Sequence, residues 1–524
     1  MSAEHGNRNL PSGVISGDRV LDVETLDRRA RRVAAAMHDV GIWQGDRVAL
    51  LLRNDLAYFE ATRGAACLGA STVPLNWHLT ADEIAHVLDD CNPKLLVAHA
   101  DLLDESILAV CSDVEVVAVA TPPEIATAYG IAPERATVPG GLPEWDSWHA
   151  AYKPWTEEPR AVMDPMFYTS GTTGKPKGVR RAKVPPELTA ETVQRTARAF
   201  GLDRSPLRAV MTGPLYHSAP NAYGMRIVGG GGLLVLQPRF DALELLGLVE
   251  RYRITNLHMV PTMFIRLLAL AEADRQRFDL SSLDFVCHGA APCPEDIKRA
   301  MIDWWGPVIH EYYAMTETGI IATSDSADWL GHPGTVGKAA EGVDLRILGT
   351  DGKPMPAGEP GEICVRTALT SFVSYHRASE KTAAMRRGDY VATGDVGYLD
   401  EDGFLYISDR ISDMVITGGV NVYPAEIENV LVGMDQVSDC AVLGVPDSEF
   451  GERLIAFIIG EDGLEEAAIR DYLADKLARY KLPREIRFAS ELPREDSGKI
   501  KKRLLREAYL NGSLPGRDAA VGLG

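Results

Sequence analysis

Residues 168–179 read YTSGTTGKPKGV and combine three glycines, three threonines, a serine and two lysines within twelve positions. Glycine lets a backbone approach a ligand closely, and hydroxyl and backbone N–H groups donate hydrogen bonds to phosphate oxygens. Lys175 and Lys177 add positive charge. The stretch is not a Walker A loop, because Pro176 follows Lys175 where that motif has Ser or Thr. We interpret it as a cradle for a polyphosphate; for a glycine-rich loop in general, the alternative is a flexible turn.

Composition restricts what else the chain can do. Its 524 residues are 46% apolar and 24% charged, which suits a globular protein of two or more domains. The net charge of −20 argues against wholesale binding of nucleic acid or anionic membranes. The seven cysteines lack paired zinc-site spacing, so we expect free, buried thiols in a reducing cytoplasm. No stretch has signal-peptide or membrane-span character; the apolar run 227–236 is too short and contains four glycines.

An alternation of short apolar strands and amphipathic helices dominates the first 400 residues. It predicts parallel sheets covered by helices on both faces, an α/β fold. One helix is expected over 79–90, where Thr80 and Glu83 are spaced for a capping box. The clearest strand signals are 47–54, 93–100, 114–120 and 283–289.

The pattern changes near residue 395. Asp402-Gly403 lies between two β-like runs, which predicts a hairpin. A helix signal with Pro424 in its first turn and several short strands then predict a compact α+β unit of about 110 residues. We place the domain boundary at Arg410–Asp413, giving domains 1–410 and 411–524.

Five further segments contain candidate functional residues. Taken singly, each could instead have a purely structural role, as a tight turn, a charge at a helix N-terminus, a hairpin residue or a solvated lysine. The segments are HGAAP (288–292), YYAMTETG (312–319), TGDVGYLD (393–400), ISDRISDMVITGGVNVYPAEIE (407–428) and LPREDSGKIKKRLL (492–505).

In this order, the glycine-rich loop and these five segments resemble the adenylate-forming (AMP-binding) superfamily, and within it the acyl-CoA synthetases and fatty-acid–CoA ligases. The resemblance spans about residues 24–506. It implies an N-terminal domain of two stacked α/β subdomains plus a small β-barrel-like one, followed by a small mobile α+β C-terminal lid. It also implies an ATP-dependent acid–CoA ligase that works through an acyl-adenylate and releases AMP and pyrophosphate.

The resemblance assigns a role to each part of the nucleotide site. Thr316 would contact the α-phosphate, Glu317 would bind Mg²⁺, and Asp395 would accept hydrogen bonds from both ribose hydroxyls. Lys499 would neutralise charge as AMP is transferred, so Lys499, Thr316 and Glu317 are the expected catalytic residues. The other expected ATP-binding residues are Thr169, Ser170, Gly171, Thr172, Thr173, Gly174, Lys175, Lys177, Gly289, Ala290, Ala291, Tyr313, Arg410 and Asn421.

The lid is expected to rotate between the two half-reactions. The hinge position is Ser412, where the family usually carries Asp or Lys. After rotation, Gly418 and Gly419 would leave a narrow passage for the pantetheine arm of coenzyme A. The chain also departs from the family at Ala314, where glycine is usual, and at His288, where Ser or Gly is commoner.

The acid is the least determined part of the prediction. His217 matches a gating position of the acyl pocket, although a lone histidine is more often structural. Gly229 and Gly230 would close its far end and Ala314 would line it, so a glycine-lined pocket could be deep; the alternative is that these glycines serve a turn. We expect a medium-to-long-chain or bulky apolar acid.

Three other functions remain open at this point. A free-standing adenylation enzyme would load a carrier protein in trans, and a luciferase-like oxygenase would act on the adenylate. A catalytically dead nucleotide-binding protein is disfavoured because Lys499, Glu317 and Asp395 are all present. The expected partners are the acid, ATP and CoA, with no nucleic acid; a homodimer is one option.

Overall fold

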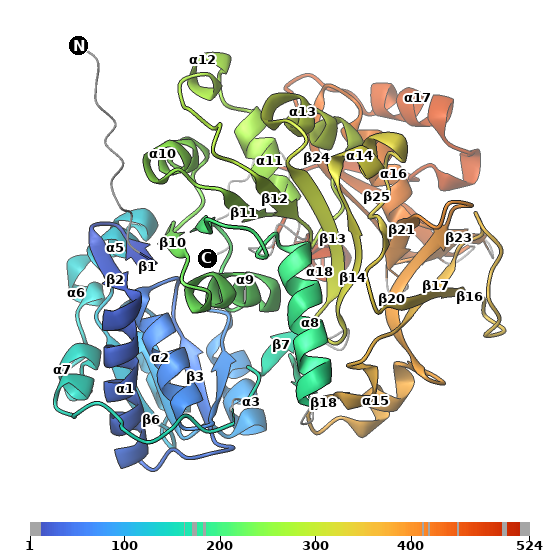
Figure 1. Cartoon of the computed structure of the whole chain (residues 1–524). Helices are drawn as coiled ribbons and strands as arrows, with labels where there is room; N and C mark the ends of the chain where they lie inside the picture. Colours follow the sequence, from blue (N-terminus) through green and yellow to red (C-terminus); the bar gives the residue numbers. More distant parts are fainter. Residues whose placement is uncertain are drawn as a thin grey trace.

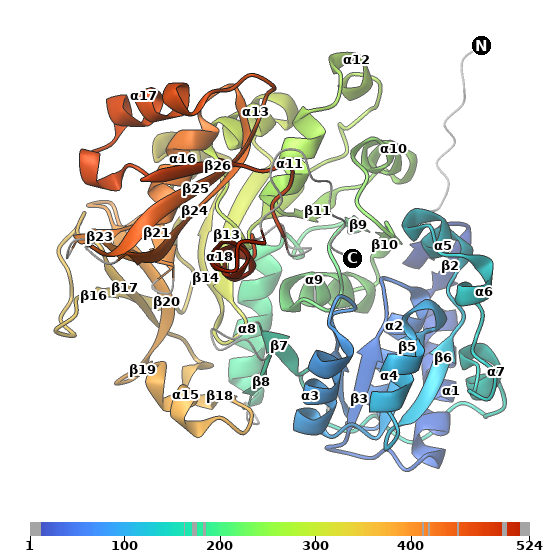
Figure 2. The same cartoon turned by 180° about the vertical axis from the view of Figure 1, so that it is seen from behind.

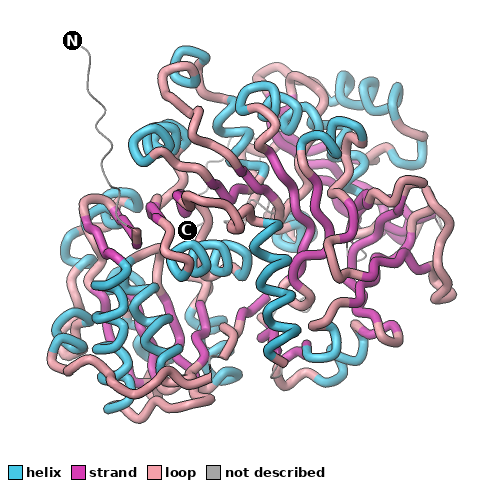
Figure 3. The backbone as a smooth tube through the Cα atoms, in the orientation of Figure 1, coloured by secondary structure: helices cyan, strands magenta, loops and turns pink. Residues whose placement is uncertain are grey.

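The computed structural model describes residues 12–161, 163–169, 176–181, 185–410, 413–417, 420–447, 450–494 and 500–513. Figures 1 and 2 show a large N-terminal part built on two α/β layers, with a smaller β-rich C-terminal part beside it. Figure 3 shows strands running through the interior of both parts with helices packed around them.

The first α/β subdomain is built on a parallel sheet with strand order β4-β3-β5-β6. Three of its strands confirm the predictions made from the apolar runs, with shorter bounds. Helix α3 begins with the predicted capping box, in which Thr80 and Glu83 bond reciprocally to each other's backbone N–H. The strands are β3 (Arg47–Leu51), β4 (Ser71–Pro74), β5 (Leu95–His99) and β6 (Glu115–Val119). The helices are α1 (Val23–Asp39), α2 (Leu56–Cys67), α3 (Ala81–Cys91), α4 (Glu105–Val110), α5 (Pro123–Tyr129), α6 (Pro133–Ala136) and α7 (Trp145–Ala150), with a 3₁₀ turn at Ala100–Leu102.

The second subdomain is built on a nine-stranded sheet with order β15-β14-β13-β12-β11-β9-β10-β1-β2. Strands β1, β9, β10, β11, β12 and β13 run parallel to one another, while β2, β14 and β15 pair antiparallel with their neighbours at the two edges. The strands are β1 (Gly13–Ser16), β2 (Arg19–Asp22), β9 (Arg208–Met211), β10 (Leu233–Leu236), β11 (Asn256–Met259), β12 (Phe285–His288), β13 (Ile309–Met315), β14 (Gly319–Ser324) and β15 (Lys338–Ala339).

Successive residues of these strands point to opposite faces, as the pleat requires. Val210 and Val286 pack into one core with α10, α11 and α13, whereas Met211 and Cys287 pack into another with α9. The helices are α8 (Pro186–Ala199), α9 (Ser218–Gly229), α10 (Ala242–Tyr252), α11 (Pro261–Leu268), α12 (Glu272–Arg275), α13 (Glu295–Trp305) and α14 (Ser326–Gly331).

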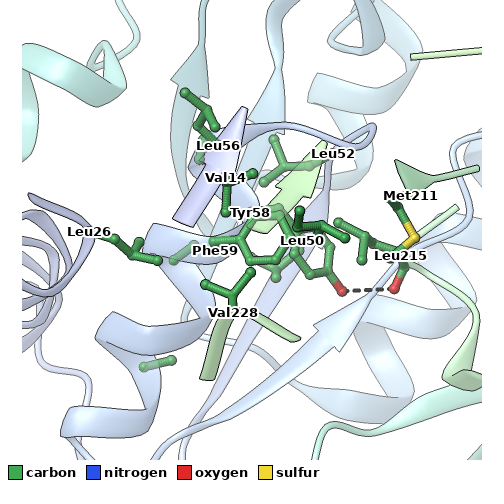
Figure 4. Close-up of a cluster of buried hydrophobic side chains, with 14 of the residues drawn as sticks. Val14, Leu26, Leu50, Leu52, Leu56, Tyr58, Phe59, Met211, Leu215 and Val228 are labelled. Atoms are coloured by element: carbon green, nitrogen blue, oxygen red, sulfur yellow. Dashed lines mark hydrogen bonds between the residues drawn. The ribbon is translucent and has the colours of Figure 1, made fainter. Parts of the chain in front are cut away.

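One continuous apolar core joins the two subdomains. Leu50 and Phe59 of the first meet Met211 and Val228 of the second, and Figure 4 shows their side chains interleaved. Within this cluster the Tyr58 hydroxyl donates to the Leu215 carbonyl at 3.0 Å. A buried phenol needs such a partner, so this bond fixes one layer against the other.

Two antiparallel sheets complete the N-terminal domain. The five-stranded one contains the predicted hairpin, with Gly403 at its turn in the left-handed region (φ +81°). Its strands are β16 (Asp344–Leu348), β17 (Gly361–Arg366), β19 (Arg386–Arg387), β20 (Tyr390–Leu399) and β21 (Leu405–Arg410). The three-stranded one joins β7 (Phe167–Thr169), β8 (Lys177–Arg181) and β18 (Val373–Tyr375), followed by α15 (Ser379–Ala384). A 3₁₀ turn at Thr370–Phe372 precedes β18.

The C-terminal domain has its own five-stranded sheet and its own apolar core. Asp409, at the end of β21, accepts a hydrogen bond from the backbone N–H of Ala425 in α16 at 2.9 Å and so contacts this domain. The strands are β22 (Val415–Thr417), β23 (Val420–Val422), β24 (Val437–Asp447), β25 (Gly451–Gly460) and β26 (Glu485–Phe488). The helices are α16 (Pro424–Val432), α17 (Glu466–Lys476) and α18 (Lys502–Leu510), with a 3₁₀ turn at Arg479–Lys481.

All seven cysteines are free thiols, five buried and two half-buried, as the composition predicts. Among the helices that the structure describes, none is long and apolar enough to cross a membrane.

Candidate functional site

The predicted nucleotide segments follow neighbouring strands. Strands β12 and β13 are parallel partners, with His288 opposite Glu311. Residues 289–291 follow β12, and the turn 316–318 follows β13. The carboxyl ends of parallel strands share one edge of a sheet, which is where α/β proteins bind ligands. The structure therefore brings the HGAAP and TETG segments to one edge.

Gly289 and Ala290 shape the loop after β12. A Cβ atom at Gly289 would lie 2.7 Å from both the carbonyl oxygen and Cζ of Tyr312, so only glycine fits. Ala290 adopts φ +70°, a left-handed conformation that costs an L-residue about 1–2 kcal/mol. Such strain concentrates at functional sites. The loop is thus built to keep side-chain bulk away from the sheet edge.

Tyr313, predicted to bind ATP, and Asp395, predicted to bind its ribose, are in direct contact. The Tyr313 hydroxyl donates to Asp395 Oδ2 at 2.5 Å, joining β13 to β20. The backbone N–H of Asp395 donates to the Thr393 hydroxyl at 3.1 Å, which fixes its strand position. Arg410 is the Cα partner of Asp395 across the β20–β21 pair, but its side chain lies outside the described residues.

Thr316 and Glu317 occupy the tight turn of the β13–β14 hairpin, before Gly319 at φ +77°. The hydroxyls of Thr316 and Ser218 lie 3.2 Å apart, which places the start of α9 beside this turn. Glu317 is only 6% exposed. Its Oε1 accepts a hydrogen bond from the Tyr375 hydroxyl at 2.7 Å.

Tyr375 contacts two of the predicted site residues, Glu317 and Lys177, although the sequence does not single it out. It lies on β18, whose partner β8 begins with Lys177. The Lys177 ammonium lies 5.7 Å from the centre of the Tyr375 ring. No sequence signal marks this tyrosine, because about 200 residues separate it from Lys177 and a single aromatic residue forms no pattern.

The ends of the glycine-rich loop are fixed by strand pairing. Thr169, the last residue of β7, is the antiparallel partner of Lys177, the first residue of β8. The loop therefore connects two paired residues. His86 of α3 contacts the carbonyl oxygen of Pro176 at 3.3 Å, and Tyr168 donates to Asp90 of the same helix at 2.6 Å.

Several predicted residues lie outside the described part of the chain and stay predictions. They comprise most of the phosphate loop, the hinge, the glycine pair and the lysine of the SGK segment. These residues are Ser170, Gly171, Thr172, Thr173, Gly174, Lys175, Ser412, Gly418, Gly419 and Lys499, together with the side chain of Asn421.

The predicted acyl residues are less closely grouped. His217 immediately precedes α9 without a side-chain capping bond, and it packs against Tyr216, with ring centres 4.5 Å apart. Ala314 lies at a bulge in the β13–β14 pairing. Gly229 and Gly230 are exposed where α9 ends, and a Cβ at Gly229 would have no other atom within 4 Å. This geometry matches the alternative that these two glycines serve a turn.

Fold and site together define an adenylate-forming enzyme, and comparison with known proteins supports that class. The family described as AMP-binding enzyme matches residues 7–375, and the AMP-binding enzyme C-terminal domain matches residues 426–499. The chain therefore belongs to the AMP-binding enzyme family.

Relatives with acid–thiol ligase names cover almost the whole chain. A feruloyl-CoA synthase from Amycolatopsis sp. is 34% identical (95% of this chain, 96% of that protein). The long-chain-fatty-acid–CoA ligase FadD13 of Mycobacterium tuberculosis is 32% identical (92% of each). The fatty acid–[acyl-carrier-protein] ligase ScoC of Streptomyces coeruleorubidus is 31% identical (95% and 94%). The chain is thus an AMP-forming acid–thiol ligase of the acyl/aryl-CoA ligase family.

Solved structures agree with this placement. ATP-bound MatB from Rhodopseudomonas palustris superposes with a TM-score of 0.82 at 28% identity (96% of this chain, 97% of that one). The o-succinylbenzoate CoA synthetase of Bacillus subtilis, in complex with its acyl-adenylate intermediate, gives 0.80 at 26% (97% and 96%). The predicted α/β fold, with a large N-terminal and a small C-terminal domain, is confirmed.

Proposed function

We propose that the chain is an ATP-dependent carboxylic acid–CoA ligase that forms an acyl-adenylate and then a CoA thioester, releasing pyrophosphate and AMP. The observation that carries the proposal is the convergence of three features at one sheet edge. They are the loop at Gly289, the Tyr313–Asp395 pair and the Glu317 turn. The family resemblance assigns the first two to the nucleotide and Glu317 to its Mg²⁺.

The chemistry explains why these groups are needed. A carboxylate resists attack by a thiol because oxide is a poor leaving group, whereas its mixed anhydride with AMP has a good one. The enzyme must first bring two anions together and then stabilise the departing pyrophosphate. Positioning and fixed positive charge supply most of such an acceleration.

Mg²⁺ fits the Glu317 turn. This carboxylate is buried, and the described residues contain no cluster of three or more His, Cys, Asp or Glu side chains that would form a complete protein cage. Mg²⁺ typically binds one or two carboxylates and takes its other ligands from phosphate and water. When bound, it would neutralise phosphate charge, and Glu317 would hold it beside Thr316.

The remaining roles follow the family pattern. Lys499 would approach the α-phosphate and the acid carboxylate, where a compact ammonium stabilises the transferred group. The C-terminal domain, bounded near residues 410–411, would act as a lid rotating at Ser412. After rotation, Gly418 and Gly419 would line the route of the thiol.

For the acid, we propose a medium-to-long-chain or bulky apolar carboxylate. Two relatives carry feruloyl and long-chain fatty-acid names, so both classes occur among similar enzymes. Helix α9 begins beside Thr316 and continues with the half-buried Ala219, Ala222 and Met225. An apolar helix face starting at the reacting centre favours an apolar acyl group.

The direct test is a screen of pyrophosphate release over fatty and aryl acids, with and without CoA. We expect release that depends on the acid, and a CoA thioester detected by mass spectrometry when CoA is present. Acid-dependent release without any thioester would contradict the CoA ligase assignment.

A second candidate is a ligase that loads a carrier protein in trans, which the ScoC relative favours. Offering CoA and a holo-carrier protein as competing acceptors for the same adenylate separates the two. We expect CoA to be the faster acceptor; exclusive transfer to the carrier would favour this second candidate.

A further inference from the structure

Tyr375 brings together three elements that lie far apart in the sequence. They are its own strand β18, the β13–β14 turn and the start of β8. Its hydroxyl donates to Glu317 in the β13–β14 turn, and its ring faces Lys177 at the start of β8. Figures 1 and 2 show β7, β18 and α15 together below the β13–β14 hairpin. A single phenol thus contacts both a buried carboxylate and the lysine that ends the glycine-rich loop.

The backbone around Tyr375 is held from both sides. Tyr375 is the β-partner of Val179, and its N–H donates to the Thr382 hydroxyl at 3.0 Å. The next residue, His376, donates its N–H to the Gly178 carbonyl at 2.8 Å, and its ring contacts the Asp90 carbonyl at 3.1 Å. Bonds on both edges of this short strand fix the backbone from which the phenol extends to Glu317.

The charges nearby suit a phenol that only donates. The Tyr375 hydroxyl is an ordinary phenol, which is protonated at neutral pH and can therefore donate to the Glu317 carboxylate. The Lys177 ammonium already supplies a positive charge on the ring of Tyr375. A neutral donor can orient the carboxylate and leave its negative charge in place, whereas an added cation would neutralise that charge.

We propose that Tyr375 is a positioning residue of the first half-reaction. Its hydrogen bond fixes the rotamer of Glu317, so that the other carboxylate oxygen is presented to the Mg²⁺ of bound ATP. Ligands of a metal are usually oriented by such outer hydrogen bonds, and losing one typically weakens metal affinity 10–100-fold. The inference rests on the proposed function, since it assigns Mg·ATP to the Glu317 turn.

The test compares Tyr375→Phe with the wild type by ATP binding, measured calorimetrically with and without Mg²⁺ and without any acid. Phenylalanine keeps the ring over Lys177 and removes only the hydroxyl. We expect Mg²⁺ to tighten ATP binding by the wild type. The variant should need at least a tenfold higher Mg²⁺ concentration for the same tightening of ATP binding. In turnover, KM for Mg·ATP should rise while KM for the acid stays unchanged.

Tyr152→Phe is the matched control. Tyr152 makes the same phenol–carboxylate bond, to Asp39 at 2.7 Å, in the first subdomain. It should leave Mg²⁺ dependence unaltered. In a Glu317→Gln background, Tyr375→Phe should add nothing, because the carboxylate it orients is gone.

The outcomes separate the two proposals. An unchanged Mg²⁺ dependence in folded Tyr375→Phe, or an additive effect in the Glu317→Gln background, would overturn the positioning role. The positioning role would also be overturned if ATP binding by the wild type did not depend on Mg²⁺. If Mg·ATP binding behaves as expected but no acid releases pyrophosphate, the positioning role stands and the ligase proposal fails. Thermal unfolding of each variant confirms that it is folded.

Discussion

The part of the site predicted to bind phosphate (the phosphate side) and the part predicted to bind the acid (the acyl side) are built in different ways. On the phosphate side, Glu317, Tyr375 and Lys177 are joined by direct contacts between short strands and tight turns. On the acyl side, Tyr223 of α9 packs in one aromatic group with Phe200, His258 and Tyr312. Hydrogen-bonded polar groups tolerate little change in position, whereas apolar packing tolerates changes of shape. This difference would let one nucleotide chemistry serve many acids.

The largest effect is expected at Lys499. Lys499→Ala should reduce acid-dependent pyrophosphate release by about 10²–10³-fold or more, the scale for losing a preorganised charge stabiliser. Thioester formation from supplied acyl-adenylate should persist, because the anhydride is already made. Both half-reactions are measured separately, by released pyrophosphate and by thioester product.

Lys501→Ala is the control for this experiment, since Lys501 lies two residues on at the start of α18. It should leave both half-reactions close to wild type. Near-normal adenylation by Lys499→Ala would remove the lysine from the mechanism.

Gly289→Ala tests whether backbone contact limits the loop after β12. The added methyl would lie 2.7 Å from the Tyr312 carbonyl oxygen, and a backbone atom cannot rotate away. We expect a loss of about 1–3 kcal/mol in stability, typical of overpacking, and a clear rise in KM for ATP. Calorimetric unfolding and ATP kinetics measure the two effects.

Gly140→Ala is the matched control, because a Cβ there meets no atom within 4 Å. It should change neither quantity. If Gly289→Ala also left both unchanged, the loop after β12 would have more room than this geometry allows.

The stability of the folded protein should fall at acidic pH because His258 is buried as a neutral ring. Burial lowers the pKa of His258 from 6.5 to about 4, so the folded protein keeps this ring neutral where the unfolded chain takes up a proton. Stability should therefore fall as pH drops from about 6.5 towards 4, by up to ~1.4 kcal/mol per pH unit for one proton. In His258→Gln this part of the slope should disappear, as urea unfolding at several pH values would measure.

The glutamine amide can still bond the Tyr312 hydroxyl, which His258 Nε2 contacts at 2.7 Å. His288 and His310 also have lowered pKa values, so a shallower pH dependence should remain in His258→Gln. Identical slopes in wild type and His258→Gln would show that His258 is not held neutral.

The sequence could predict local features of the structure but not the pairing of distant segments. The capping box at Thr80–Glu83 and the hairpin at Gly403 are local signals and proved correct. Apolar runs gave the buried strands, because both faces of a parallel sheet are covered. The pairing of β18 with β8 could not be predicted, since neither short strand has a distinctive pattern. Tyr375 was missed for that reason, although Glu317 beside it was named from its motif.

The acyl side differs because its shape depends on packing between distant elements. Glycines 229 and 230 suggested an open pocket by their lack of side chains, yet they lie exposed at the end of α9. Ala222 lies one helical turn from Ser218 on the same face, and Ser218 contacts Thr316. Steric limits on the acid should therefore come from Ala222 rather than from these glycines.

The smallest effect is expected at Gly229, and it tests this contrast most directly. Gly229→Ala should leave the acid profile and the melting temperature unchanged, because the added methyl has open space. Ala222→Leu, by comparison, should cut turnover of the bulkiest acids at least tenfold, the scale of crowding a pocket by a few methyl groups. Profiles over acids of increasing size measure both. If Gly229→Ala rejects the longest acids while Ala222→Leu does not, the acyl pocket ends at the glycine turn and the deep-pocket prediction is correct.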